Sequence, residues 1–508
     1  MDIPKGTIKS NELDKFLENS IDYHLQAFYD KISQYEPISL FENWRKLIRC
    51  IDELINIPIE AKSDNELDEF LKSNIDFDNL INSSNSVRKS KKFLSERFSI
   101  DVGERYSQLI MMCCAIHKAF ILHNYYEISG NSLNLENVEN SIEFFQSRRI
   151  YFVTTLFLIP KIAKGNKKSE FIHLLNDLLQ IMDSCLVNVT TSYHNLLINN
   201  SILDFEMTFD NNKGIGNFIF NQLESFYLNP QRLSLIDQLE LRKENLKIEV
   251  LISKNSKKIF SFNEIADTMA LLSSAFKKYN IENTIKFKEL NILFQNLARY
   301  LFDDYDIILD EDQFNNIQNQ VRKLNLYNES NEYFTNLNSI SPFQKLNKTY
   351  YTTVVLLNRY AYNLILNDLL SNRKFQINSG FIFEDRISII LELYGFTDTK
   401  ITRIKRKEFD VVTIKNNKIF NFQCKNNYYN ISDVNYNFKV IANLNRRLCK
   451  YYEKAILKEK NRENLLKDRL EINNIEHFVI SRFPVITKNE KIINFNNLEN
   501  WLQNYVNY

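Results

Sequence analysis

Residues 409–425 read FDVVTIKNNKIFNFQCK and predict a β-hairpin. Two apolar stretches, each long enough for a strand, flank the polar turn Lys415–Lys418. Side chains alternate between the two faces of a strand, so Gln423 and Lys425 share one face with Asn421. The other face carries Phe420, Phe422 and Cys424, which can pack on a helix.

Asp410 stands at the head of the first strand and is therefore expected beside Gln423 and Lys425. Carboxylate and amide oxygens are hard ligands that suit Mg²⁺ or Mn²⁺. A nearby ammonium group can orient a water molecule, ease its deprotonation or stabilise a pentavalent phosphate. A metal and a lysine beside a phosphodiester are suited to its hydrolysis. Glu384, on a helix predicted from about Gly380 to Tyr394, adds a third oxygen ligand or a water-positioning base.

The pattern around this hairpin predicts a small α/β sheet with helices on its faces. The helix that carries Glu384 is expected to end at Gly395-Phe396. Strands are expected at residues 400–406, 409–414, 418–425 and 476–483, and further helices at 438–470 and 498–505. This order, α-β-β-β-α-β, assigns residues 372–508 to one domain.

The preceding region, residues 1–344, is predicted to be a large helical unit. Glycine and proline both break helices, and the chain has only 8 and 7 of them among 508 residues. A candidate subdomain break lies near residues 211–262, with short strands expected at 246–252 and 258–262. A connecting helix is expected over residues 345–371. The fold class is therefore mostly α, with a C-terminal α/β domain.

The charge is distributed unevenly along the chain. Hydrophobic residues make up 44% and charged residues 25%, as in globular proteins. Residues 371–508 contain 24 lysines and arginines against 15 aspartates and glutamates, a net charge of +9. The whole chain carries +1, so residues 1–370 carry −8. A basic module joined to an acidic one suggests a polyanionic partner, although a solvated lysine face gives the same bias.

Several classes of protein are disfavoured by the sequence. The six cysteines show no C-x-x-C spacing, which argues against a zinc cluster. The N-terminus has no apolar core typical of a signal peptide, and the apolar stretches are too short to span a bilayer. We therefore expect a cytoplasmic protein with no membrane partner. No phosphate-binding glycine-rich loop is present, so ATP hydrolysis is not expected.

Four segments in order resemble the PD-(D/E)xK nuclease superfamily, and most closely its Mrr-like restriction endonucleases. They are Gly380-Phe381-Ile382-Phe383-Glu384, Gly395-Phe396, Glu408-Phe409-Asp410 and Gln423-Cys424-Lys425. The resemblance covers about 130 of the 508 residues. It implies a restriction-endonuclease-like fold for residues 372–508.

The resemblance also implies a role for each motif residue. Asp410 would be the main metal ligand, with a further ligand from the backbone carbonyl of Cys424. Lys425 would be the catalytic lysine and Glu384 the acid on the helix. Gln423 would occupy the position usually filled by glutamate or aspartate. An amide binds Mg²⁺ more weakly than a carboxylate and cannot act as a base, but the Mrr-like branch has glutamine here.

The expected function is therefore cleavage of DNA by an endonuclease that depends on Mg²⁺ or Mn²⁺. Analogy with the family suggests a role in bacterial defence against foreign DNA. Two alternatives remain open: an inactive nuclease fold that binds nucleic acid or acts as a scaffold, and an RNA nuclease. DNA is preferred to RNA as the partner. The helical region is expected to respond to a trigger or a protein partner, and an oligomer remains open.

Other residues are weaker candidates for binding nucleic acid. Exposed cations are expected at Lys405, Arg406 and Lys407, and on the long helix at Arg446, Arg447 and Lys450. Each of these also fits an ordinary solvated surface. Tyr428 and Tyr429 could stack on a base, although packing is preferred, and Glu392 is expected to be a solvated helix acid.

Overall fold

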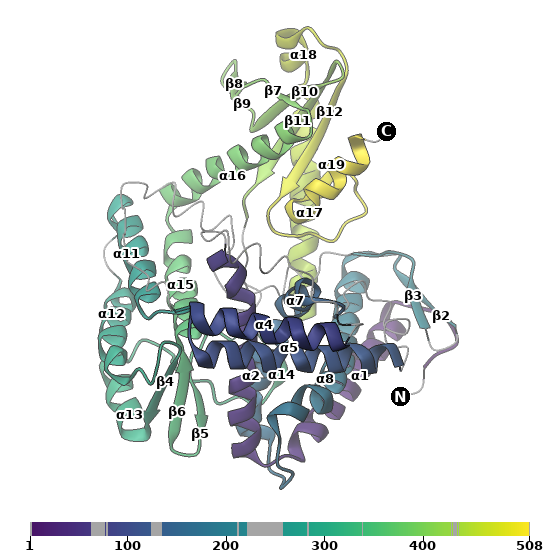
Figure 1. Cartoon of the computed structure of the whole chain (residues 1–508). Coiled ribbons are helices and arrows are strands. Elements are labelled where there is room, and N and C mark those ends of the chain that lie inside the picture. Colours follow the sequence, from purple (N-terminus) through teal and green to yellow (C-terminus); the bar gives the residue numbers. More distant parts are fainter. Residues whose placement is uncertain are drawn as a thin grey trace.

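Three groups of helices and strands follow one another along the chain (Figure 1). The computed structural model describes residues 3–61, 77, 80–122, 135–210, 213–220, 258–281, 284–337, 339–427, 429, 434 and 436–506. Helices dominate the described residues, and an α/β unit stands at the C-terminal end, so the mostly α fold class is confirmed. None of the described helices is both long enough and apolar enough to cross a membrane.

The first group is a helical body with a small three-stranded sheet in the order β1-β2-β3. Apolar residues recur at helical spacing and bury one face of each helix; α1, for example, buries Leu13, Leu17 and Ile21. The elements are β1 (Gly6–Lys9), α1 (Ser10–Ser33), α2 (Pro37–Ala61), α4 (Leu80–Arg97), α5 (Ile100–Leu122), α7 (Val138–Ile162), α8 (Phe171–Ser201), β2 (Glu206–Asp210) and β3 (Lys213–Gly216).

The second group has a hydrophobic core of its own, which begins at Ile265 and ends at Phe375. Helices surround a three-stranded antiparallel sheet in the order β4-β6-β5. The elements are α11 (Asn263–Lys278), α12 (Ile285–Leu297), η1 (Ala298–Tyr300), β4 (Asp306–Asp310), α13 (Glu311–Gln320), α14 (Tyr333–Asn336), β5 (Gln344–Leu346), β6 (Thr349–Thr353) and α15 (Val354–Leu370).

The predicted connecting helix over residues 345–371 is wrong in its first part. Strands β5 and β6 occupy that part, and helix α15 begins only at Val354. Residues 349–353 read TYYTT, and β-branched and aromatic residues favour strands. Thr353 then caps the helix, because its hydroxyl accepts a hydrogen bond from the amide of Leu356 at 3.2 Å.

The strand predicted at residues 258–262 is also wrong. These residues have no regular structure and lead into α11. Their apolar side chains are buried for another reason, since the ring of Phe260 packs against Tyr305, with centroids 5.1 Å apart. The strand predicted at residues 246–252 lies outside the described residues.

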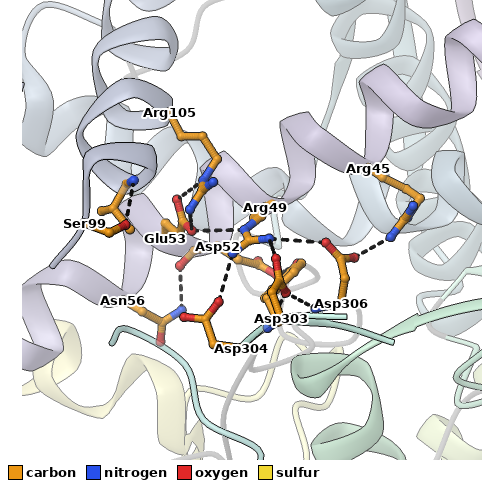
Figure 2. A network of polar contacts seen from close by, with 12 residues as sticks. Arg45, Arg49, Asp52, Glu53, Asn56, Ser99, Arg105, Asp303, Asp304 and Asp306 are labelled. Atoms are coloured by element: carbon orange, nitrogen blue, oxygen red, sulfur yellow. Dashed lines mark hydrogen bonds and ion pairs between the residues drawn. The ribbon is translucent and has the colours of Figure 1, made fainter. Parts of the chain in front are cut away.

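A partly buried ionic network joins α2 to β4 and the loop before it (Figure 2). Arg49 donates hydrogen bonds to Glu53 (3.2 Å), Asp304 (3.0 Å) and Asp306 (3.3 Å) and also pairs with Asp303. Arg105 forms a bidentate pair with Glu53, at 2.8 Å for both bonds. Charges this well paired fix the geometry of the junction, because removing one partner would leave a buried charge uncompensated.

The third group contains a five-stranded sheet in the order β13-β12-β11-β10-β7. Strand β10 runs antiparallel to both β11 and β7, whereas β11, β12 and β13 are parallel. The elements are α16 (Arg373–Leu393), β7 (Thr397–Asp398), β8 (Arg403–Ile404), β9 (Lys407–Glu408), β10 (Val411–Lys415), β11 (Lys418–Lys425), α17 (Phe438–Lys460), α18 (Asn464–Leu470), β12 (Ile475–Ser481), β13 (Ile492–Asn494), η3 (Phe495–Asn497) and α19 (Leu498–Val506).

Helices cover both faces of this sheet. Phe420 and Phe422 of β11 pack in one cluster with Phe383 of α16 and Leu502 of α19, which confirms the predicted apolar face of β11. Helices α17 and α18 lie on the other face. The lower part of α17 continues into the helical body, where Tyr193 of α8 donates a hydrogen bond to the carbonyl of Tyr436 at 2.7 Å (Figure 1).

Three predicted boundaries in this domain differ from the structure. The first helix begins at Arg373, because the side chain of Asn372 caps it by accepting from the amides of Lys374 and Phe375. The helix predicted over 438–470 is interrupted at residues 461–463. Of the strand predicted over 400–406, only Arg403–Ile404 pairs with another strand, β9, and a tight turn follows these two residues.

Candidate functional site

The predicted hairpin is present and brings Asp410 beside the second strand. Val411 pairs with Phe422, so Asp410 stands opposite Gln423 at the end of the sheet. The Asp410 carboxylate accepts a hydrogen bond from the amide of Cys424 at 2.8 Å. Lys425 donates to the side-chain oxygen of Gln423 at 3.2 Å. Gln423 and Lys425 therefore lie on β11, and Asp410 lies one residue before β10, the neighbouring strand.

The side chain of Glu384 reaches the same end of the sheet from α16. This helix is tied to the end of β11, because Asn426 donates a hydrogen bond to the hydroxyl of Ser379 at 3.1 Å. Burial raises the pKa of Glu384 to about 7, and the carboxylate of Asp410 adds to this rise. The ammonium of Lys425 acts in the opposite direction. All four predicted catalytic side chains therefore gather at one end of the sheet.

Asp410 is also held in an environment that disfavours its charge. Burial raises its pKa, while Lys425 and the hydrogen bond from Cys424 oppose the rise without cancelling it. Raised pKa values of two carboxyl groups at one site indicate that the site has less positive charge than would be needed to offset burial. A bound divalent cation would supply that charge, so the electrostatics of this edge fit a metal ion.

The amide of Gln423 is incompletely hydrogen-bonded. Its side chain is only 6% exposed. Its oxygen accepts from Lys425, whereas its nitrogen is buried without a hydrogen-bond partner among the described residues. Because the nitrogen is a donor, an acceptor such as a water or phosphate oxygen would complete it. The oxygen of this amide and the carboxylates of Asp410 and Glu384 are hard donors of the kind that Mg²⁺ or Mn²⁺ requires.

The donor set is nonetheless short of acidic residues. Within the described part of the chain, no group of three or more histidine, cysteine, aspartate or glutamate side chains is arranged to hold a metal. The candidate site offers two carboxylates, one amide oxygen and the carbonyl of Cys424. Such a set leaves room for water and phosphate oxygens, as Mg²⁺ sites commonly do.

The sequence analysis missed an ion pair behind this site, formed by Glu459 and Arg462 and called the strut below. Glu459 of α17 is 1% exposed and accepts a hydrogen bond from Asn421 of β11 at 2.9 Å. Arg462 donates to Glu459 at 2.8 and 2.5 Å and to the carbonyl of Glu408 at 2.6 Å. Its guanidinium also lies 4.5 Å from the ring centroid of Phe409.

This strut connects the residues just before Asp410 to Asn421, which lies on the same face of β11 as Gln423 and Lys425. It therefore positions the two strands of the site relative to each other. Glu459 and Arg462 fall in the charged run KEKNR at residues 458–462. Such a run normally indicates a solvated helix end, so no signal in the sequence distinguished them.

The weaker candidates have different locations. Lys405, Arg406 and Lys407 are exposed on the β8–β9 hairpin, which lies at the end of the domain away from the helical groups (Figure 1). Arg446 and Arg447 are exposed on α17. The ammonium of Lys425 lies 5.9 Å from the ring centroid of Tyr451 on the same helix. Arg447 precedes Tyr451 by four residues, about 6 Å along the helix axis, so these two arginines stay candidates for binding nucleic acid.

The remaining sequence candidates are not assigned to the site. Glu392 is exposed and lies 3.5 Å from Lys400, as expected of a solvated helix acid. Tyr429 packs edge-on against Phe483, with centroids 5.3 Å apart, and stays 39% exposed. Tyr428 lies outside the described residues.

A separate cavity of about 540 Å³ lies beside the ionic network between α2, α5 and β4. Its lining includes four cationic and four anionic side chains, so its charges balance. They are Arg45, Lys46, Arg49, Arg105, Glu42, Asp101, Glu104 and Asp306. This balance favours neither an anionic nor a cationic ligand, and we do not assign the cavity a function.

No protein-family model, curated protein or solved structure matches the chain, so a functional assignment must rest on the chemistry of the site itself.

Proposed function

We propose that the C-terminal domain, residues 372–508, is a restriction-endonuclease-like nuclease that hydrolyses DNA phosphodiester bonds with Mg²⁺ or Mn²⁺. The observation that carries this proposal is the gathering of Glu384, Asp410, Gln423 and Lys425 at one end of the sheet. The resemblance of the same four residues to the PD-(D/E)xK pattern supports it.

The proposed metal ligands are Asp410, the Gln423 oxygen, the Cys424 carbonyl and Glu384. When bound, the metal would supply positive charge to the phosphate and acidify a water molecule. The chain's own groups do the rest. The ammonium of Lys425 stands where it can stabilise negative charge on a phosphate oxygen. The Glu384 carboxylate would hold the metal or position the attacking water.

The helical region is proposed to respond to a trigger or a protein partner and to control the nuclease. Its contact with α17, at Tyr193 and Tyr436, connects the two parts of the chain physically. Bacterial defence against foreign DNA, in the cytoplasm, is the role proposed by analogy with the family that the site resembles.

The test is cleavage of supercoiled and linear duplex DNA by the full chain with Mg²⁺ or Mn²⁺, and with EDTA as the control. Asp410→Ala should abolish both cleavage and metal binding measured by calorimetry. Asp468→Ala is the matched control, because Asp468 is an exposed acid of the same domain on α18. Duplex binding without metal-dependent cleavage by the wild-type chain would favour the alternative of an inactive, binding-only domain.

A further inference from the structure

Two hairpins of the nuclease domain have the same backbone turn but very different residues in it. In the β10–β11 hairpin the two turn residues are Asn416 and Asn417, with φ values of 49° and 57°. In the β8–β9 hairpin they are Lys405 and Arg406, with φ values of 45° and 63°. Both are two-residue turns with left-handed backbone, the geometry that matches the twist of antiparallel strands.

The residues of the first turn suit this geometry, and those of the second do not. Asparagine tolerates the left-handed region because its short side chain can hydrogen-bond to the local backbone. Lysine and arginine have no such compensation, so their presence makes the turn less favourable. When a chain keeps an unfavourable pair at a turn, a role for the side chains themselves is a reasonable hypothesis.

The rest of the hairpin leaves this pair exposed at its tip. Arg403 and Glu408 form an ion pair across the two strands, and Ile404 packs against the small cluster around Phe409. Lys405 and Arg406 are both exposed at the tip. Residues 403–408 carry four cationic side chains and one anionic side chain, so the hairpin has a net charge of +3.

The hairpin also has a fixed position relative to the candidate catalytic site. Arg406 precedes Asp410 by four residues, which spans at most about 13 Å of extended chain. The strut formed by Arg462 binds the carbonyl of Glu408 and the ring of Phe409 and so fixes the base of the hairpin. A basic two-stranded ribbon therefore projects within a few base pairs' distance of the proposed scissile phosphate.

We propose that the β8–β9 hairpin enters the major groove of the B-form DNA substrate, with Lys405 and Arg406 at its tip. The major groove of B-form DNA, about 12 Å wide, admits a two-stranded ribbon. The major groove of A-form RNA is deep and too narrow for side chains to read. This inference rests on the proposed function and narrows it, because composition and charge alone do not separate DNA from RNA.

The test compares the full wild-type chain with Lys405→Asn/Arg406→Asn, which copies the turn of the β10–β11 hairpin. Binding is measured on DNA and RNA duplexes of the same sequence, in Ca²⁺ or EDTA, over a range of salt. The variant should unfold at the same temperature as wild type or higher. Its affinity for DNA should fall at least about tenfold, and the slope of log K against log salt should become shallower by about 1.8. Its affinity for RNA should fall by a smaller factor, because RNA loses only the general attraction of the two cations for phosphates.

The reverse exchange, Asn416→Lys/Asn417→Arg, is the matched control. It adds the same charges to the same type of turn on the other hairpin. It should lower the unfolding temperature and leave the preference for DNA over RNA unchanged. A fall in DNA affinity by the first variant accompanied by a loss of stability would not support the proposal, because misfolding would explain it.

Three outcomes would overturn the inference. The first variant could bind DNA as tightly as wild type, it could lose affinity for DNA and RNA by the same factor, or the wild-type chain could bind no duplex at all.

Failure of the hairpin proposal can be told apart from failure of the proposed nuclease function. If the first variant loses DNA binding but the wild-type chain never cleaves, the hairpin proposal stands and the nuclease proposal fails. If Asp410→Ala abolishes cleavage but the turn variant binds DNA as wild type does, the nuclease proposal stands and the hairpin proposal fails.

Discussion

Glu384→Gln should stabilise the metal-free nuclease domain at pH 8 and leave its stability unchanged at pH 4.5. The pKa of Glu384 is raised from 4.5 to about 7 in the folded protein. Between these values the folded state keeps a proton that the unfolded state has lost. The stability that this group provides is therefore fully present below pH 4.5 and is lost as the pH rises through 7. Glutamine mimics the protonated acid at every pH, so the gain appears only where Glu384 would be ionised.

The magnitude follows from the pKa. A rise of 2.5 pKa units corresponds to about 3.4 kcal/mol. Glu384 is only half-buried, so solvent screening reduces the expected gain to about 1–2 kcal/mol at pH 8. Because the same side chain is proposed to hold the metal or position the attacking water, the variant should also bind Mg²⁺ more weakly and cleave DNA more slowly.

The assay is urea unfolding in EDTA, followed by tryptophan fluorescence. The chain has two tryptophans. Trp501 of α19 packs against the nuclease sheet, where its ring centroid lies 5.1 Å from that of Phe478. A Trp44→Phe background makes Trp501 the sole reporter of this domain. The control is Glu392→Gln, which removes an exposed acid two turns further along α16 and should show little pH dependence. An equal gain at pH 4.5 and 8, or a loss at pH 8, would refute the reasoning.

Four further predictions follow from the same site. Lys425→Ala should abolish cleavage and spare Mg²⁺ binding in calorimetry, because an ammonium is not a ligand; loss of metal binding would contradict this role. Gln423→Glu should lower the unfolding free energy in EDTA by about 1–3 kcal/mol and tighten Mg²⁺ binding, whereas unchanged affinity would argue against ligation. Arg462→Met should lower the free energy of unfolding, measured in urea melts, by about 3–5 kcal/mol, because buried Glu459 loses its partner. Arg462→Lys should recover part of this loss of stability. The affinity for Mg²⁺ should fall as the pH drops below about 7, where Glu384 is protonated; a flat pH profile in calorimetry would exclude Glu384 from the metal site.

Strand alternation was sufficient to predict most of the candidate site. The apolar residues of β11 fixed which face packs on a helix, and so Gln423 and Lys425 had to share the other. The Asn416-Asn417 turn fixed the hairpin register and with it the position of Asp410. These are local patterns, and they hold because one face of the sheet is buried.

The errors arose where distant contacts decide the local structure. Residues 349–353 form a strand because β4 is available to pair with them, and β4 lies some forty residues earlier. Helix α17 ends at Lys460, where Arg462 turns back to Glu459 and to the carbonyl of Glu408. Strand β4 and the carbonyl of Glu408 are distant in sequence from the segments that they contact, so periodicity alone could not reveal the strand or the strut.

The glutamine at position 423 has a physical explanation in this environment. Burial and the neighbouring carboxylates already raise the pKa values of Glu384 and Asp410, and the carboxylate of Glu459 contributes to the rise at Asp410. A glutamate in place of Gln423, 6% exposed, would add a further buried charge beside them. We infer that the neutral amide limits the charge that the metal-free domain must bury while it keeps an oxygen donor in place. Glutamine here therefore does not by itself indicate a decayed site, and the exchange to glutamate should gain affinity for Mg²⁺ only by losing stability without it.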